Sequence, residues 1–131
     1  MRIAKLRTLL TRLMDDDNGC PWTSKQTYQS ITSHTREEID ELIKAIDLGD
    51  TKNIQEEVGD LLLQVLFYSA IAEKRGDFTF DDVAKTLHDK LTYRYDFIET
   101  ALAKEGGVLM DATPEELDTL WQQAKLAAQK K

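Results

Sequence analysis

The chain has 131 residues, of which 41% are hydrophobic and 31% are charged, which is typical of one folded domain with a core and excludes a disordered or fibrous protein. Its formal net charge of -7 argues against a nonspecific nucleic-acid binder, which would carry a basic stripe. The single cysteine cannot form an internal disulfide, and the sequence shows neither a secretory leader nor a run of apolar residues long enough to span a membrane. We therefore expect one cytoplasmic domain over residues 1–131, with neither nucleic acid nor a membrane as partner.

Hydrophobic periodicity and breaker residues divide the chain into helical segments, and no segment alternates as a strand would. The first helix is expected over residues 2–14 and ends at the acids, glycine and proline of DDDNGCPW. Cap and stop residues then predict helices from Ser33 or Thr35 to 48, from 51 to about 75, from about 79 to the EGG at 105–107, and from the TPEE at 113–116 onward. The predicted fold class is all-α, a four- to five-helix bundle.

Two acidic pairs border the most apolar part of the chain. Glu38 and Glu41 lie in the second expected helix, and Glu57 and Asp60 lie in the third. At about 100° per residue, each pair occupies the same edge of its helix's apolar stripe. The short LGDTKN connection favours an antiparallel hairpin in which Glu41 and Asp60 lie at similar distances from the turn. The four carboxylates are therefore expected to converge.

Converging carboxylates raise the free energy of the fold unless a cation neutralises them or some of them take up protons. Oxygen-only ligands suit Mg²⁺, with Mn²⁺ as a substitute, and protein-bound Mg²⁺ usually keeps positions for water or substrate phosphate. The alternative is an ordinary solvated helix face, with Lys44 and Lys52 as charge partners. Because the acidic pair is duplicated and aligned across a hairpin, we favour the metal site.

The order and spacing of these motifs closely resemble the MazG-like nucleoside triphosphate pyrophosphohydrolases of the all-α NTP pyrophosphatase superfamily. The signature of that family is EExxE followed by ExxD, which corresponds here to Glu37-Glu38-x-x-Glu41 and Glu57-x-x-Asp60. The similarity extends over most of the chain and includes GCPW at 19–22, AEKRGDFTFDDV at 72–83, Lys90 with Arg94, and Trp121-x-x-x-Lys125.

This resemblance implies hydrolysis of a nucleoside or deoxynucleoside triphosphate to the monophosphate and pyrophosphate. It implies that Mg²⁺ is held by the four carboxylates Glu38, Glu41, Glu57 and Asp60. Either Glu38 or Glu41 is then the candidate for activating the attacking water, while Glu37 either serves a second metal or faces solvent.

The resemblance also assigns substrate contacts outside the carboxylates. Phosphate contacts fall on Lys90, Arg94 and Lys125, with Trp121 nearby. Trp22 and Gln26 are candidates for the nucleobase, the first for stacking and the second for hydrogen bonds, although plugging the end of the bundle is an alternative role for Trp22.

Assembly as a homodimer or homotetramer is implied by the resemblance. It is favoured independently by LLLQVLFYSAIA after Asp60, which is apolar nearly all round and needs burial on several sides.

The sequence departs from the family pattern at two places. Tyr95-Asp96-Phe97-Ile98 stands where relatives have an HPHVF-like segment, and Asn53 stands where they often have lysine. Alternative activities are dUTPase-like or phosphoribosyl-ATP pyrophosphohydrolase activity, and a noncatalytic acidic helical binding module remains a further alternative. A di-iron bundle is disfavoured because no E-x-x-H motif occurs.

Overall fold

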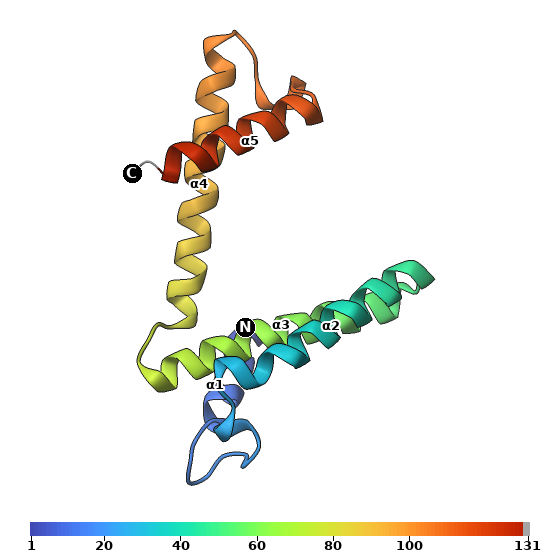
Figure 1. Ribbon diagram of the computed structural model, residues 1–131, viewed down its shortest axis with the longest axis vertical. Coiled ribbons are helices and arrows are strands. Elements are labelled where there is room, and N and C mark those ends of the chain that lie inside the picture. The colour runs from blue at the N-terminus through green and yellow to red at the C-terminus, as the bar shows by residue number, and fades with distance from the viewer. Residues whose placement is uncertain (130–131) are drawn as a thin grey trace. The chain divides into compact units, whose positions relative to one another are not determined.

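The structure is a computed structural model that describes residues 1–129, where it contains helices and no strand (Figure 1). The predicted all-α class is confirmed. No helix in this described part is long and apolar enough to cross a membrane. The elements in chain order are α1 (Arg2–Leu13), η1 (Thr23–Lys25), α2 (Tyr28–Leu48), α3 (Thr51–Arg75), α4 (Phe80–Lys104), η2 (Leu109–Asp111) and α5 (Pro114–Gln129).

The start of α2 differs from the prediction. We expected this helix to begin at Ser33 or Thr35, but it begins at Tyr28 with Thr27 as the N-cap. The Thr27 hydroxyl accepts a hydrogen bond from the Ser30 backbone N–H (3.1 Å), and the Ser30 hydroxyl accepts one from the Thr27 backbone N–H (2.8 Å). This capping box has serine at the position where glutamate or glutamine is usual, so the pattern was missed in the sequence.

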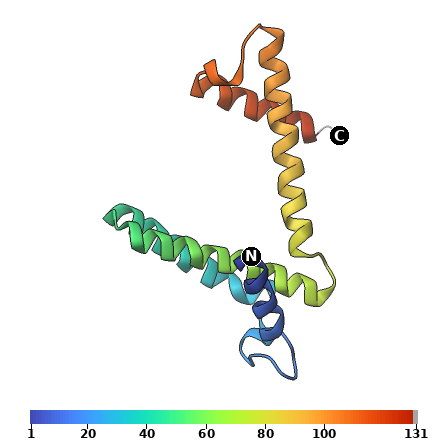
Figure 2. The ribbon, with the colours of Figure 1, turned by 180° about the vertical axis from the view of Figure 1, so that it is seen from behind.

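Helices α2 and α3 form the predicted antiparallel hairpin and run side by side in both views (Figures 1 and 2). The turn between them is tight because Gly49 takes the left-handed conformation, with φ of 69°, that ends α2. Asp50 begins α3, and its carboxylate accepts a hydrogen bond from the Asn53 backbone N–H (3.2 Å). The turn therefore sets which residues of the two helices face each other.

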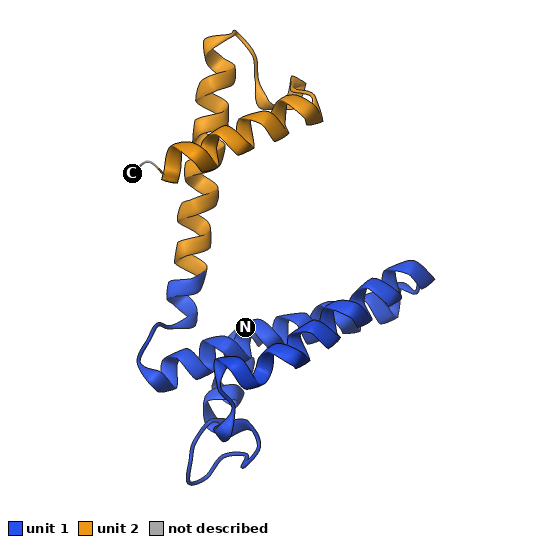
Figure 3. Ribbon diagram, viewed as in Figure 1, with its two compact units in different colours: residues 1–83 blue, residues 84–131 orange. Residues whose placement is uncertain are grey.

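The chain divides into two compact units, residues 1–83 and residues 84–131 (Figure 3). The expectation of a single domain over residues 1–131 stays a prediction. In the first unit α1 packs against α3, and the core contains Leu10, Met14, Ile31, Leu66, Phe67, Ala70 and Ile71. In the second unit the buried apolar side chains are Ile98, Leu102 and Ala124.

The loop after α1 is held by its own backbone and by α3. The Asp15 carboxylate accepts hydrogen bonds from the backbone N–H groups of Asp17 (2.9 Å) and Asn18 (2.8 Å). A Cβ at Gly19 would lie 2.4 Å from a backbone carbonyl oxygen, so only glycine fits there. Lys74 of α3 donates to the Asp16 carboxylate (2.5 Å) and anchors the loop that carries the predicted base contacts.

Candidate functional site

The hairpin brings together four carboxylates, two from each helix. These are Glu38 and Glu41 of α2 and Glu57 and Asp60 of α3, and one oxygen of each lies within 4.8 Å of the others. This is the convergence that the helical spacing predicts. In the described part of the chain, no other group of three or more metal-ligating side chains comes together in this way.

Two of these carboxylates carry an oxygen that lacks a partner. Glu38 Oε2 and Glu57 Oε2 are buried and form no hydrogen bond with any described residue. A buried carboxylate oxygen without a partner is costly, and such an oxygen in a folded protein calls for an explanation such as an ion. A cation held between α2 and α3 would supply the missing partner.

The electrostatics of the cluster lead to the same requirement. Burial raises the pKa of Glu38 and of Glu57 above the ordinary range, and the negative charges of Glu41 and Asp60 raise both pKa values further. Every neighbouring charge that acts on these two pKa values is another carboxylate. A cation held among the four carboxylates would favour their charged forms and so oppose this rise in the pKa values.

Over residues 1–129 the structure does not contain the ion pairs expected for the alternative, a solvated acidic helix face with lysines as charge partners. Among the described residues, neither Lys44 nor Lys52 forms an ion pair with any of the four carboxylates. The donor atoms of the cluster are all carboxylate oxygens, which suit a hard divalent cation such as Mg²⁺ or Mn²⁺. The residues present therefore fit a metal of this class.

Glu37 lies outside the cluster. Its side chain is 69% exposed, and its carboxylate lies 3.9 Å from His34 Nδ1, one turn earlier in α2. Glu37 therefore faces solvent, and its alternative role at a second metal stays a prediction.

Trp22 packs on the hairpin while keeping about half of its surface free. Its ring meets His34 of α2 at 5.6 Å between centroids and Phe67 of α3 at 5.9 Å, both edge to face. The residue is 52% exposed, so packing against the bundle leaves part of the indole accessible. His34, for which the sequence indicates a structural or solvent-exposed position, is partly exposed and serves as one of the two packing partners of Trp22.

Gln26 is engaged within the protein. Its Nε2 donates to the Trp22 carbonyl (3.0 Å), and its Oε1 accepts from the Ser30 hydroxyl (2.7 Å). The side chain therefore ties the loop to the first turn of α2, and a contact with a base edge would compete with these bonds.

In the second unit one of the predicted basic residues, Arg94, lies against an indole ring. The Arg94 guanidinium of α4 lies 4.7 Å from the centre of the Trp121 ring of α5, and the Tyr95 ring lies 5.7 Å from the same indole. Arg94 Nε is buried without a hydrogen-bond partner among the described residues. Lys90 lies one helical turn before Arg94 in α4, and Lys125 lies one turn after Trp121 in α5, both at the i,i+4 spacing.

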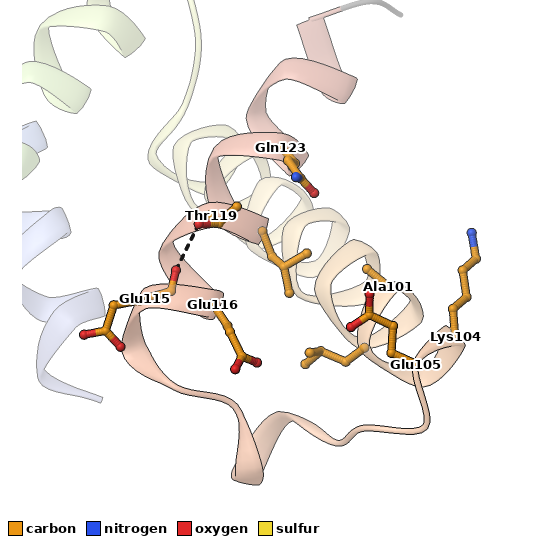
Figure 4. Close-up of a pocket in the computed structure, with 9 residues that line it drawn as sticks. Ala101, Lys104, Glu105, Glu115, Glu116, Thr119 and Gln123 are labelled. Carbon is orange, nitrogen blue, oxygen red and sulfur yellow. Dashed lines mark hydrogen bonds between the residues drawn. The ribbon is translucent and has the colours of Figure 1, made fainter.

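A hollow within the second unit contains none of the predicted site residues (Figure 4). It lies between the last turns of α4 and the first turns of α5, and Glu105 and Glu116 border it. The Glu115 backbone carbonyl accepts a hydrogen bond from the Thr119 hydroxyl (3.0 Å). Nothing about these side chains indicates a ligand.

Comparisons with known proteins point to one family. The model of the MazG nucleotide pyrophosphohydrolase domain matches residues 26–98, more than half of the chain, a range that includes the four carboxylates. A nucleoside triphosphate pyrophosphohydrolase of Escherichia coli K12 is 36% identical over 118 residues, which are 90% of this chain and 45% of that protein. The nucleoside triphosphate pyrophosphohydrolase/pyrophosphatase MazG of Thermotoga maritima is 48% identical over 77 residues, 59% of this chain and 30% of the relative.

The chain thus spans less than half the length of these two relatives. Among solved structures, it is similar to the crystal structure of a mazG-related protein from Thermotoga maritima, with a TM-score of 0.71 and 21% identity over 93% of this chain and 97% of the other. At this identity the structural likeness concerns the all-α fold.

Proposed function

This chain belongs to the MazG nucleotide pyrophosphohydrolase family, and we propose that it hydrolyses nucleoside or deoxynucleoside triphosphates to the monophosphate and pyrophosphate with Mg²⁺ as cofactor. The observation that carries the proposal is the convergence of Glu38, Glu41, Glu57 and Asp60 from two helices. The biological task proposed with this activity is sanitation or control of the nucleotide pool, in the cytoplasm.

The four carboxylates would hold Mg²⁺, with Mn²⁺ as a possible substitute. When bound, such a cation neutralises charge on a polyphosphate and lowers the pKa of water. Phosphoryl transfer needs little covalent work from the protein, so positioning and charge stabilisation are the main contributions of the side chains.

Glu38 is the proposed base that takes a proton from the attacking water, with Glu41 as the alternative. Burial raises the pKa of Glu38, and a carboxylate with a raised pKa is a stronger base.

Positive charge for the phosphates is proposed to come from Lys90, Arg94 and Lys125. The Arg94 guanidinium lies over the Trp121 ring, and a guanidinium held against an aromatic ring suits bidentate contact with phosphate oxygens. Trp22, which is partly exposed, is proposed to stack on the base. Gln26 is proposed to exchange its hydrogen bonds within the loop for hydrogen bonds to the base edge.

We also propose assembly into a homodimer or homotetramer. Large apolar side chains remain exposed along the hairpin: Ile39, Ile43, Ile46, Val58, Leu62 and Val65, with exposed fractions from 36% to 54%. A second copy of the chain would cover them.

The test of the activity is pyrophosphate release from a panel of canonical and noncanonical triphosphates, diphosphates and phosphoribosyl-ATP, with Mg²⁺ present or chelated. We expect release from triphosphates only with the metal, and loss of release in Glu41→Gln. Asp40→Asn, which removes a neighbouring exposed acid of α2, is the matched control and should stay active.

Release confined to dUTP or to phosphoribosyl-ATP would replace the proposed activity with one of the two related ones. Absence of release from every nucleotide, with no difference between wild type and Glu41→Gln, would identify a noncatalytic acidic module.

A further inference from the structure

A row of polar side chains crosses the hairpin beside the carboxylates. The Thr35 hydroxyl of α2 donates to Gln64 Oε1 of α3 (2.9 Å) and lies 2.8 Å from the Tyr68 hydroxyl. A threonine hydroxyl has one proton, which Thr35 shares between Gln64 and the Ile31 carbonyl (3.2 Å), so Tyr68 acts as the donor in the remaining bond. Gln64 is only 6% exposed, so the row is largely shielded from water.

These bonds lie at one defined level of the hairpin. Thr35 precedes Glu38 by three residues and Gln64 follows Asp60 by four, and both spacings place side chains on adjacent turns of one helix face. Because α2 and α3 are antiparallel, both steps lead away from the turn at Gly49. The Thr35–Gln64 bond therefore joins the helices at the first level beyond the carboxylates, where the apolar core of the unit begins.

This position matters because the four carboxylates repel one another when they are charged, and that repulsion opposes close packing of the two helices. Apolar packing resists separation but tolerates small sliding, whereas a buried hydrogen bond is directional and specifies one arrangement. Metal ligands have to be held within a fraction of an ångström to bind well, and side chains behind the ligands usually provide that support.

We propose that Thr35 and Gln64 are positioning residues for the metal site. Their hydrogen bond, supported by Tyr68, holds α2 and α3 in the register at which the four carboxylates bind a divalent cation. This inference rests on the proposed function for the presence of the cation, and it adds a role for residues outside the ligand set.

The test is Mn²⁺ binding to the intact chain, measured by electron paramagnetic resonance without nucleotide. Thr35→Val keeps the shape of the side chain but removes the hydroxyl, and we expect it to weaken Mn²⁺ binding by about 10- to 100-fold, as for other residues that support metal ligands. Thr35→Ser restores the hydroxyl and should bind like wild type. Thr32→Val is the matched control, because among residues 1–129 the Thr32 hydroxyl bonds only within α2, to the Gln29 carbonyl (2.8 Å).

Two further variants distinguish loss of this hydrogen bond from a general loss of folded protein. Tyr68→Phe leaves the Thr35–Gln64 bond in place and should weaken binding less than Thr35→Val does. Gln64→Leu should weaken binding as Thr35→Val does, and the double variant should lose little more than either single one, because both remove the same bond.

Unchanged Mn²⁺ affinity in folded Thr35→Val and Gln64→Leu would overturn the positioning role while leaving the metal site intact. An equal loss in Thr32→Val would also overturn it, because the effect would then be general to α2. Absence of Mn²⁺ binding in wild type would instead remove the metal site itself, and this inference with it.

Discussion

Glu38 of α2 and Glu57 of α3 place carboxylate oxygens within 4.8 Å of each other. The charged form of each side chain is disfavoured by this proximity, and also because each has a buried oxygen without a hydrogen-bond partner among the described residues. Two helices that pack closely around such groups store electrostatic repulsion at their interface. Binding of a divalent cation relieves it, so stability, pH and metal binding are expected to be coupled in this chain.

The first prediction concerns pH and Mg²⁺. Because the pKa values of Glu38 and Glu57 are raised in the folded state, their protonated forms favour folding. This contribution is fully present below the unfolded pKa of about 4.3 and is lost as pH rises through the raised folded values. Mg²⁺ needs the charged carboxylates, so the stabilisation by Mg²⁺ should grow as pH rises over the same window.

The measurement is the difference in Tm between excess MgCl2 and chelator, from about pH 5 to about pH 8. At about 100 times Kd the metal should add about 2.7 kcal/mol to the free energy of unfolding at the upper end. A difference that is flat with pH, or largest at acid pH, would contradict the coupling.

The second prediction is that Glu57→Gln stabilises the metal-free protein. The substitution keeps the shape of a side chain whose charge is disfavoured by burial and by neighbouring carboxylates, so the free energy of unfolding at neutral pH should rise. The same variant should lose the Mg²⁺-dependent rise in Tm, and pyrophosphate release should fall by about 100-fold or more.

Denaturant titration in chelator, with and without added metal, measures both effects. Glu56→Gln is the control, because Glu56 is an exposed acid next in sequence and its replacement should change stability by less than about 0.5 kcal/mol. Destabilisation by Glu57→Gln in chelator would show that the cluster is not under repulsion.

The third prediction concerns Arg94. Lysine at this position keeps the charge but loses the planar group that stacks on Trp121 at 4.7 Å. We expect Arg94→Lys to raise KM for the triphosphate by about 10-fold with a smaller change in kcat, the pattern that follows when a phosphate contact is misaligned. Steady-state kinetics measures this split, with Lys104→Arg, at the end of α4, as a control for the exchange of cations. Equal kinetics for Arg94→Lys and wild type would exclude a bidentate phosphate contact.

The fourth prediction concerns assembly. Ile43 is 50% exposed on α2, and glutamate at this position would place a charge on the apolar surface that a second copy is proposed to cover. Ile43→Glu should therefore shift the protein toward monomer in size-exclusion chromatography with light scattering, without unfolding it. Leu48→Glu, at the end of α2 where the side chain is 79% exposed, should leave the mass unchanged. A monomeric wild type would contradict the proposed assembly.

Most of the helix boundaries could be predicted because the signals for them are local. Gly49 with Asp50, and Thr113 ahead of Pro114, specify a helix end or start within a few residues. The start of α2 at Tyr28 was predicted wrongly for a local reason too, since Ser30 is an unusual partner in a capping box.

The ring contacts of Trp22 could not be predicted in the same way. Trp22 lies in a loop and contacts His34 of α2 and Phe67 of α3. These contacts therefore join three elements that are separate in the sequence. Helical periodicity describes one helix at a time and does not specify which residue of another element fills a given space.

The order of amino acids alone was enough to predict five helices, a tight hairpin and four carboxylates at one level, because helix period and turn length are properties of short segments. Packing decided the rest. Only when α2 and α3 lie together do Glu38 and Glu57 lose water from one oxygen each, and only then does Thr35 meet Gln64. Burial and hydrogen bonding between helices depend on surfaces contributed by distant residues, which no local pattern contains.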